Sequence, residues 1–481
     1  MMWAVALAAL AITLAWLVRV NSAMQSVPEE ISRLSPRRWT RKELRDTYER
    51  LKQKPVDFAK LLPPRLGRRY VVVGGSGLVG GDIVLQLLQR GEAPESIRIV
   101  DFVPLNRRDM LEAAAGCDFV KADISSRASV EAAFFRPWPA SVAKQPLTVF
   151  HTAAIVRPQE RSLLLYHRLS PVNRDGARNV LEVAKAAGAD VFIATSSASV
   201  SILPPKFWIW PWQSTPENYV QVASEKDFDA PLRPRHLFFS NYAFSKAEAE
   251  RAVCAANQDG FRTGAIRPGN PIYGQKTDSV LGMVLRMGSI VSWIPHIIQN
   301  FVYSRNVALA HLQFEAALAQ IDKPMPRCAG RTFNVTDPGP PIALADSYVA
   351  AQELSVTPVR VTYQRPIVLF LIAHVIEAWC LLLARLPFLT KLGLREPSGP
   401  IHMLQPSVFS VSIHTVVDDS QARKSVADGG FGYTPGCTTM EGMCEQIREW
   451  NREQQELGWR SAEGPAGKVA KAALTAKGVA A

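Results

Sequence analysis

The sequence predicts an α/β fold in which helices cover both faces of a doubly wound parallel sheet. Short apolar runs that suit buried strands alternate with helical stretches through the middle of the chain. A glycine-rich turn joins the first of these runs to an apolar-periodic helix, and an acidic residue ends the second run. The expected strands lie at 70–73, 97–101, 117–120, 147–151, 191–196 and 263–267.

Composition and charge describe a folded protein with enough apolar residues for a large core. Of the 481 residues, 47% are hydrophobic and 20% are charged. The formal net charge of +12 is scattered along the chain, so we expect no nucleic-acid partner and consider an anionic membrane surface the better match. The six cysteines form no C-x-x-C pair, which indicates ordinary thiols in a reducing compartment.

The N-terminal stretch MMWAVALAALAITLAWLV carries no charged side chain and is at the short end for a membrane-spanning helix. A cleaved signal peptide is the competing interpretation. However, the basic residues follow the apolar run, beginning with Arg19, instead of preceding it. We therefore expect an uncleaved anchor and a cytoplasmic body. The expected organisation is an anchor at 1–20, a linker with a short helix at 21–66, a nucleotide-binding and catalytic domain at 67–355, a smaller C-terminal substrate- and membrane-contact region at 356–459, and a disordered tail at 460–481.

The segment GGSGLVG lies between a strand and a helix, where glycines let the backbone turn tightly and approach a pyrophosphate. Helix N–H groups then face the phosphates. Asp101 ends the next strand and can bind the adenosine ribose, which favours NAD. Arg107 and Arg108 follow closely and leave NADP open. The pattern predicts a Rossmann-type dinucleotide site, with the glycines Gly74, Gly77 and Gly80.

A second group of residues suits proton transfer to or from an alcohol. Tyr242 and Lys246 are four residues apart in YAFSK, so a helix would place them on one face. A lysine ammonium near a phenol is expected to lower the pKa of that phenol. Ser197 in TSSASV is expected to hold the substrate oxygen, with Ser196 as its rival. Tyrosine can then act as the acid/base while hydride moves to a nicotinamide.

Together these motifs resemble an extended short-chain dehydrogenase/reductase of the 3β-hydroxysteroid dehydrogenase family, and within it the sterol C4-decarboxylating dehydrogenases. The resemblance is strong from about 68 to 355 and weaker to about 455. It implies NAD(P)-dependent oxidation of a 3β-hydroxyl on a sterol, steroid or triterpenoid, with or without loss of a C4 carboxylate as carbon dioxide. The matching segments include VFHTAA, VNRDGARNVLEVAKAAG, TSSASV, YAFSK, RPGNPIYG and NVALAH.

The resemblance also implies roles for individual positions. It places Asp123 and Ile124 near the adenine and makes Ala153 and Ala154 the floor of the cofactor site. Pro268 and Ile272 would lie where the family covers the nicotinamide. Further positions are Asn173, which belongs to a family motif and also suits a helix or turn hydrogen bond, and Asn306 and His311, which we interpret as structural.

Two departures from the family pattern concern the region of the tyrosine. Asn241 stands where the family often has proline. The 45-residue separation of Ser197 and Tyr242 is longer than expected, and the extra length contains LPPKFWIWPWQ. We expect Phe207, Trp208, Ile209, Trp210 and Trp212 to form a lip that dips into a membrane surface or covers an apolar substrate; packing on the protein itself is the alternative.

The apolar stretch 366–389 contains only His374, Glu377 and Arg385 as ionisable groups. Its narrow polar stripe suits a helix that lies in the membrane interface or caps a lipid pocket, although a spanning or core helix is also compatible. Taken with these apolar segments, the resemblance implies an endoplasmic reticulum membrane enzyme, with a homodimer left open. The alternatives are a reductase or epimerase of a non-sterol molecule such as a nucleotide sugar, and a scaffold without turnover.

Overall fold

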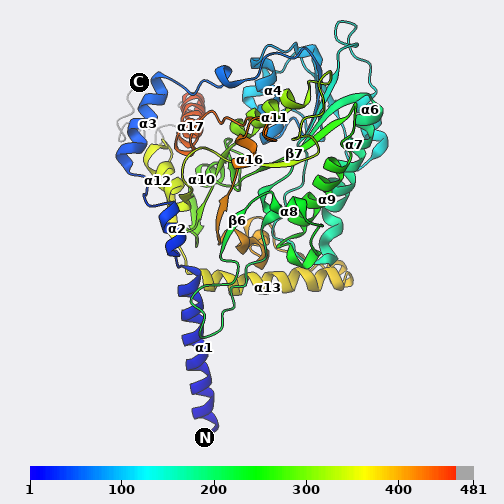
Figure 1. The fold of residues 1–481 in the computed structure, drawn as a ribbon. Coiled ribbons are helices and arrows are strands. Elements are labelled where there is room, and N and C mark those ends of the chain that lie inside the picture. The colour runs from blue at the N-terminus through cyan, green and yellow to red at the C-terminus, as the bar shows by residue number, and fades with distance from the viewer. Residues whose placement is uncertain (462–481) are drawn as a thin grey trace.

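A computed structural model describes residues 1–461, so most of the tail expected at 460–481 lies outside the described residues. Its centre is a seven-stranded parallel sheet with the strand order β12-β7-β5-β4-β1-β2-β3 (Figure 1). The expected α/β fold and all six expected strands are confirmed. The strands are β1 Arg69–Val73, β2 Ile97–Asp101, β3 Asp118–Lys121, β4 Leu147–His151, β5 Ala189–Thr195, β7 Arg262–Pro268 and β12 Thr332–Val335.

Helices cover both faces of this sheet, and each face has its own hydrophobic core. One core joins the strands to α4 (Leu78–Gln89) and α11 (Ser304–Leu318). The opposite core joins them to α6 (Arg127–Phe134), α7 (Ala177–Ala186) and α9 (Asn241–Ala255). Parallel strands buried on both faces explain why the strand segments read as nearly continuous apolar runs.

A four-stranded sheet with the order β13-β10-β15-β6 joins the C-terminal region to earlier parts of the chain. Its strand β15 comes from the region expected at 356–459, whereas β6 lies in the long insertion, so the two regions are interleaved. Two-stranded sheets pair β11 with β8 and β14 with β9. The bounds are β6 Val220–Ala223, β8 Ile272–Tyr273, β9 Ser289–Ser292, β10 Ile298–Gln299, β11 Val302–Tyr303, β13 Ile342–Ala343, β14 Arg360–Tyr363 and β15 His414–Val417.

The segment expected as a linker at 21–66 is more ordered than that description implies. It contains α2 (Glu29–Leu34) and the expected short helix, α3 (Arg41–Gln53). Thr40 and Glu43 form a capping box at the start of α3. Leu44, Tyr48 and Leu51 are buried in the largest core, and α3 packs against α12 (Leu344–Leu354) and α17 (Thr439–Ser461). This segment is therefore part of the folded body.

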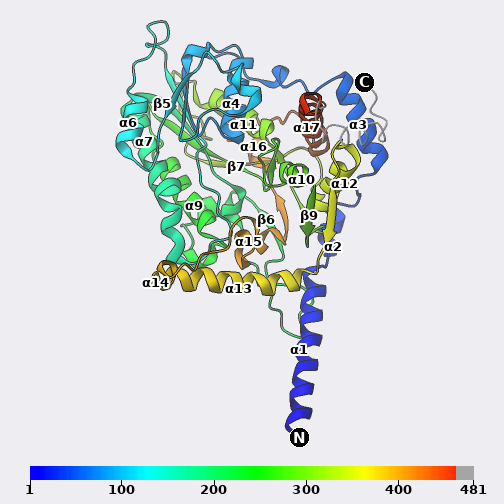
Figure 2. The same cartoon turned by 180° about the vertical axis from the view of Figure 1, so that it is seen from behind.

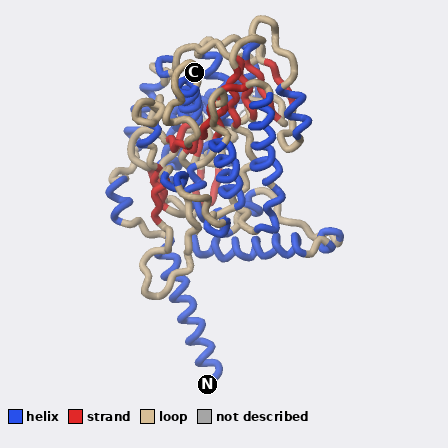
Figure 3. The backbone as a smooth tube through the Cα atoms, turned by 45° about the vertical axis from the view of Figure 1, so that its right-hand side comes forward, coloured by secondary structure: helices blue, strands red, loops and turns tan. Residues whose placement is uncertain are grey.

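Two described helices are long and apolar enough to cross a membrane, by length and composition. The first, α1 (Met2–Met24), projects away from the body, whereas α13 (Pro366–Arg385) lies across the foot of the body where α1 leaves it (Figures 1 and 2). Figure 3 shows the same crosswise arrangement from the side. The remaining short helices are α5 Arg108–Leu111, α8 Lys226–Asp229, α10 Leu281–Met287, α14 Phe388–Lys391, α15 Pro400–Met403 and α16 Ser420–Arg423.

Candidate active site

The glycine turn is built as a dinucleotide loop requires. Gly74 has a φ of +84°, in the left-handed region that favours glycine. A Cβ on Gly80 would lie 2.3 Å from the carbonyl oxygen of Gly74, so only glycine lets α4 pack this closely. A Cβ on Gly77 would meet only that same oxygen, at 3.1 Å. Gly77 is the N-cap residue of α4, and it is exposed and has no side chain. A phosphate could therefore approach the N–H groups at the start of this helix.

Asp101 lies at the carboxyl end of β2, beside this turn. Its carboxylate accepts hydrogen bonds of 3.0 Å from the backbone N–H groups of Ser76 and Val103. These bonds fix the acid at the position where a ribose would bind. Arg107 is held by Asp82 and Asp109, at 2.6 and 2.7 Å.

The other residues expected around the cofactor lie at the ends of neighbouring strands. Asp123 follows β3 and accepts hydrogen bonds from the N–H and hydroxyl of Ser125, at 2.9 and 2.7 Å. Ile124 is buried against Gly176. Ala153 follows β4, and its backbone nitrogen would be 2.6 Å from a Cβ on Gly74. Ala154 is half-buried beside it.

Ser197 and Tyr242 come together at the carboxyl end of β5. The Ser197 side chain hydrogen-bonds to the Tyr242 phenol. It also accepts hydrogen bonds from the Ser199 hydroxyl at 2.8 Å and from the Asn270 amide at 3.3 Å. The hydroxyl of Ser196 is buried and has no hydrogen-bond partner among the described residues. The geometry therefore favours Ser197 over Ser196 as the partner of the tyrosine.

The electrostatics of this site differ from the sequence expectation. Burial raises the pKa of Tyr242 to about 12, and the hydrogen bond with Ser197 opposes this only in part. Lys246 donates to the carbonyl oxygen of Thr195 at 2.5 Å. Burial lowers the pKa of Lys246 to about 8, while the nearby Glu250 raises it. The expected lowering of the tyrosine pKa by Lys246 is therefore absent here, because the desolvation of the phenolate dominates.

Asn241 and Asn173 both hold the segment that follows β4. The Asn241 N–H donates to the Glu160 carbonyl oxygen, and its amide donates to that of Ser162, both at 2.8 Å. A proline at position 241 would have no N–H to donate. Asn173 accepts from the Ile155 N–H at 2.8 Å and contacts Ser245 on α9 at 3.2 Å.

The expected structural roles of His311 and Asn306 agree with their contacts. His311 lies within 2.8 Å of the Thr195 hydroxyl and 2.7 Å of the Val307 carbonyl oxygen. Burial lowers the pKa of His311 to about 4, so the ring is neutral. Asn306 donates to Asp337 at 2.7 Å and holds the loop before α17. Both side chains are fully buried.

Comparison with known proteins places the chain in a family. The family model for the 3-beta hydroxysteroid dehydrogenase/isomerase family matches residues 71–350, which is more than half of the chain. The chain belongs to this family. It is therefore an oxidoreductase on the extended short-chain dehydrogenase scaffold, as the sequence motifs indicated.

Individual relatives are distant. A decarboxylating sterol-4-alpha-carboxylate 3-dehydrogenase of Schizosaccharomyces pombe is 26% identical over 356 residues, covering 72% of this chain and 93% of the relative. The human protein of that description is 27% identical, covering 57% of this chain and 63% of the relative. A solved UDP-glucose 4-epimerase of Thermotoga maritima has a TM-score of 0.52 and 16% identity, covering 80% of this chain and 99% of the epimerase. That likeness shows the fold alone.

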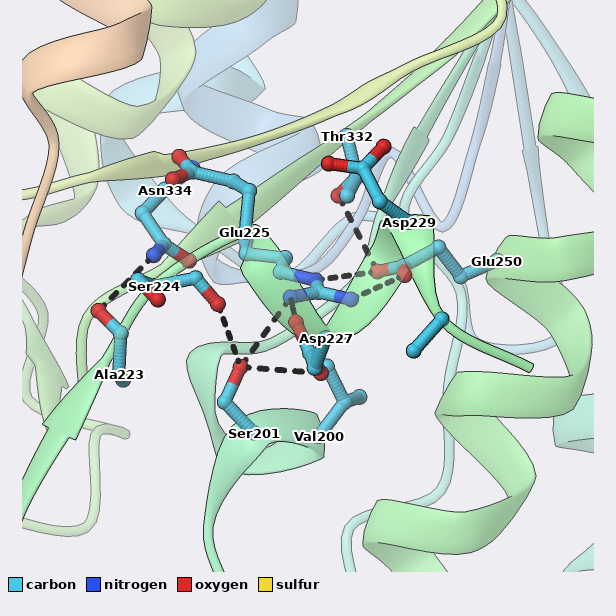
Figure 4. Close-up of polar contacts among 12 residues, drawn as sticks. Val200, Ser201, Ala223, Ser224, Glu225, Asp227, Asp229, Glu250, Thr332 and Asn334 are labelled. Atoms are coloured by element: carbon cyan, nitrogen blue, oxygen red, sulfur yellow. Dashed lines mark hydrogen bonds and ion pairs between the residues drawn. The ribbon is translucent and has the colours of Figure 1, made fainter. Parts of the chain in front are cut away.

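A buried ion-pair network lies behind Ser197 and Tyr242, and the sequence motifs do not reveal it. Arg267 on β7 donates to Glu250 on α9 at 2.5 and 2.8 Å, and to Asp227 at 2.7 Å. It also contacts the Ser201 hydroxyl at 3.1 Å. Figure 4 shows Ser201, Asp227 and Glu250 converging from different elements. The network thus ties the helix of Tyr242 to β7, to the insertion and to the turn after Ser197.

Proposed function

We propose that this enzyme oxidises the 3β-hydroxyl of a sterol or triterpenoid to a ketone with NAD, and that a C4 carboxylate, where present, leaves as carbon dioxide. The observation that carries the proposal is the pairing of Ser197 with Tyr242 at the same sheet edge as the glycine turn. The sterol assignment draws on the two decarboxylating dehydrogenases that resemble the chain.

In this proposal, the chain's own residues bind the alcohol and take its proton. Ser197 holds the alcohol oxygen, and the Tyr242 oxygen accepts the proton as the ketone forms. Lys246, with a pKa of about 8, is mostly protonated at neutral pH and supplies positive charge in this buried region. NAD supplies the hydride acceptor when it is bound. The ketone then makes an adjacent carboxylate part of a β-keto acid. That acid loses carbon dioxide to give an enol, which takes up a proton at carbon and releases its hydroxyl proton to give the neutral ketone.

The residues around Asp101 support NAD over NADP. A 2′-phosphate would face the carboxylate of Asp101. Arg107 and Arg108 would have to neutralise that phosphate, but both are already engaged. Arg107 pairs with Asp82 and Asp109, and Arg108 pairs with Glu456. Recruiting Arg107 would leave the buried carboxylate of Asp82 unpaired, which is costly.

We further propose that α1 anchors the enzyme in the endoplasmic reticulum membrane, with the catalytic body in the cytoplasm. Its 23 residues would extend about 34 Å as a helix, enough for a hydrocarbon core of about 30 Å. Only 6% of the apolar stretch of this N-terminal helix is buried within the protein. The basic residues at its body end, beginning with Arg19, agree with a cytoplasmic orientation. In the same proposal, 67–355 binds nucleotide and carries the catalysis, and 356–459 completes the substrate side.

The test follows NADH formation by full-length enzyme in detergent, given a 3β-hydroxysterol with or without a 4α-carboxylate. Tyr242→Phe should lose about 10²–10⁴-fold in kcat. Tyr363→Phe is the matched control, because Tyr363 is an exposed tyrosine on β14. Carbon dioxide released only from the acid would support the decarboxylating reaction. No sterol-dependent NADH above Tyr242→Phe would refute the sterol assignment, and turnover of UDP-glucose instead would favour the epimerase alternative.

A further inference from the structure

The outward face of α13 is apolar along its length. Its large exposed side chains recur at helical spacing, so they form one stripe. The most exposed of them, Val375, has 70% of its surface accessible. The stripe continues beyond the helix into Phe388 and Leu392. The exposed apolar side chains on or just after α13 are Val368, Leu371, Ile372, Val375, Leu382 and Leu386.

Two of the polar side chains of α13, His374 and Glu377, face the body. Glu377 is buried and accepts two hydrogen bonds of 2.7 Å from Arg161. His374 packs against the rings of Phe370 and Trp208, with centroids 4.7 and 5.9 Å apart. Arg385 alone of the three ionisable residues is exposed, at the end of the helix. A helix that directs its polar side chains toward the protein and its apolar side chains outward exposes a large apolar patch. Such patches are typical of surfaces that contact a membrane or another protein.

The tryptophan segment forms a second part of the same surface. Trp210 and Trp212 stack on one another with centroids 5.3 Å apart, and they are 63% and 76% exposed. Phe207 and Ile209 are buried in the core, so the expected five-residue lip is reduced to its tryptophans. Trp208 links them to α13 through Phe370, at 5.1 Å.

This segment is fixed to the body end of α1. Trp16 stacks on Trp208 at 5.4 Å, and its indole N–H donates to the Ile209 carbonyl oxygen at 2.9 Å. Arg19 donates to the Gln213 carbonyl oxygen at 2.8 Å. The exposed tryptophans therefore lie at the level where a membrane-crossing α1 would leave the bilayer, which is where tryptophan is enriched in membrane proteins.

We propose that the stripe of α13 together with Trp210 and Trp212 is a lipid-docking surface that lies in the interfacial layer of one bilayer leaflet. The proposal rests on α1 being the anchor. Since α13 lies across the foot of the body, where α1 leaves it, one membrane can contain α1 and contact α13 along its length (Figure 2). Exposed basic residues border the surface and complement anionic headgroups. They are Arg385, Lys391 and Arg395.

The docking surface is connected to the catalytic tyrosine. Glu377 on α13 holds Arg161, and the residues on either side, Glu160 and Ser162, hold Asn241. Asn241 directly precedes Tyr242 at the start of α9. These contacts connect α13 to the start of the helix that carries Tyr242.

Site-specific photocrosslinking of the full-length chain tests this surface. We would place p-benzoylphenylalanine at Val375, at Trp212, and at Phe135 as a control, since Phe135 is an exposed apolar residue at the end of α6. The protein is reconstituted in phosphatidylcholine vesicles containing phosphatidylserine, irradiated, and analysed by mass spectrometry. Lipid adducts at 375 and 212 but not at 135 are expected.

Two results would overturn the proposal. One is a yield of lipid adduct at 375 and 212 no higher than at 135. The other is a covalent dimer through 375, which would make a second copy of the chain the occupant of this face. Alkaline extraction of the same vesicles distinguishes the two proposals. Protein that resists extraction but forms no adduct keeps the anchor and loses the docking surface, whereas extracted protein refutes the anchor itself.

Discussion

Removing the charge of Glu250 should both destabilise the protein and change the pH dependence of kcat. Glu250 and its partner Arg267 are both about 2% exposed, and two hydrogen bonds join them. In Glu250→Gln, Arg267 keeps Asp227 but loses its bidentate partner. Breaking a buried ion pair by removing one partner costs about 3–5 kcal/mol. The pair of Arg127 with Glu131 is exposed and screened by solvent, so its loss should change stability little, and Glu131→Gln is the matched control.

The stability assay is thermal unfolding followed by circular dichroism. A chain of this size has an unfolding entropy of about 1 kcal/mol per kelvin, so the Tm of Glu250→Gln should fall by about 3–5 °C. The Tm of Glu131→Gln should change by about 1 °C or less. Equal effects of the two substitutions would refute the assignment of Glu250 as a buried structural charge.

The activity assay is the pH profile of kcat for the same two variants. Glu250 raises the pKa of Lys246, so its removal should move that pKa further below 8. If protonated Lys246 supports turnover, the alkaline decline of kcat should start at lower pH in Glu250→Gln than in the wild type. The profile of Glu131→Gln should be unchanged. An unshifted profile in a folded Glu250→Gln enzyme would refute the electrostatic link between this acid and Lys246.

Three further predictions concern the nucleotide and proton-transfer residues. The pKa of Lys246 falls from 10.5 in the unfolded chain to about 8 in the folded protein. Because the unfolded chain then binds more protons between pH 8 and 10, the free energy of unfolding should rise with pH over that range. Denaturant unfolding of Lys246→Met should lose that rise. Asp101→Asn should weaken NAD binding by about tenfold without a matching gain for NADP, as measured by the two KM values. Gly80→Ala should lower the Tm more than Gly77→Ala, because only the former adds a carbon 2.3 Å from a backbone oxygen.

The sheet was predictable because its rules are local. Each buried strand carries its own apolar run, and the glycine turn marks the first crossover. Tyr242 and Lys246 were predictable because the helical repeat fixes their relation, and Ser197 because it closely follows the end of a strand. Chemistry set by the surroundings was not predictable. The phenol's pKa depends on how completely the fold desolvates it, and no local pattern gives that quantity.

The network of Arg267 shows a second limit of local patterns. Its members come from β7, α8, α9 and the turn after β5, so only tertiary structure brings them together. A faint signal exists, since Glu250 lies one helical turn beyond Lys246. The orientation of α13 could not be predicted for a related reason. Sequence shows that its ionisable groups share an arc, but the partner Arg161 decides whether that arc faces water or protein.

The long insertion between Ser197 and Tyr242 makes contacts at both of its ends. Its tryptophan end is stacked on α1 through Trp16 and Trp208. Its return through β6 and α8 brings Asp227 to Arg267, directly behind the catalytic helix. The insertion thus connects the body end of the proposed anchor to the ion-pair network behind α9.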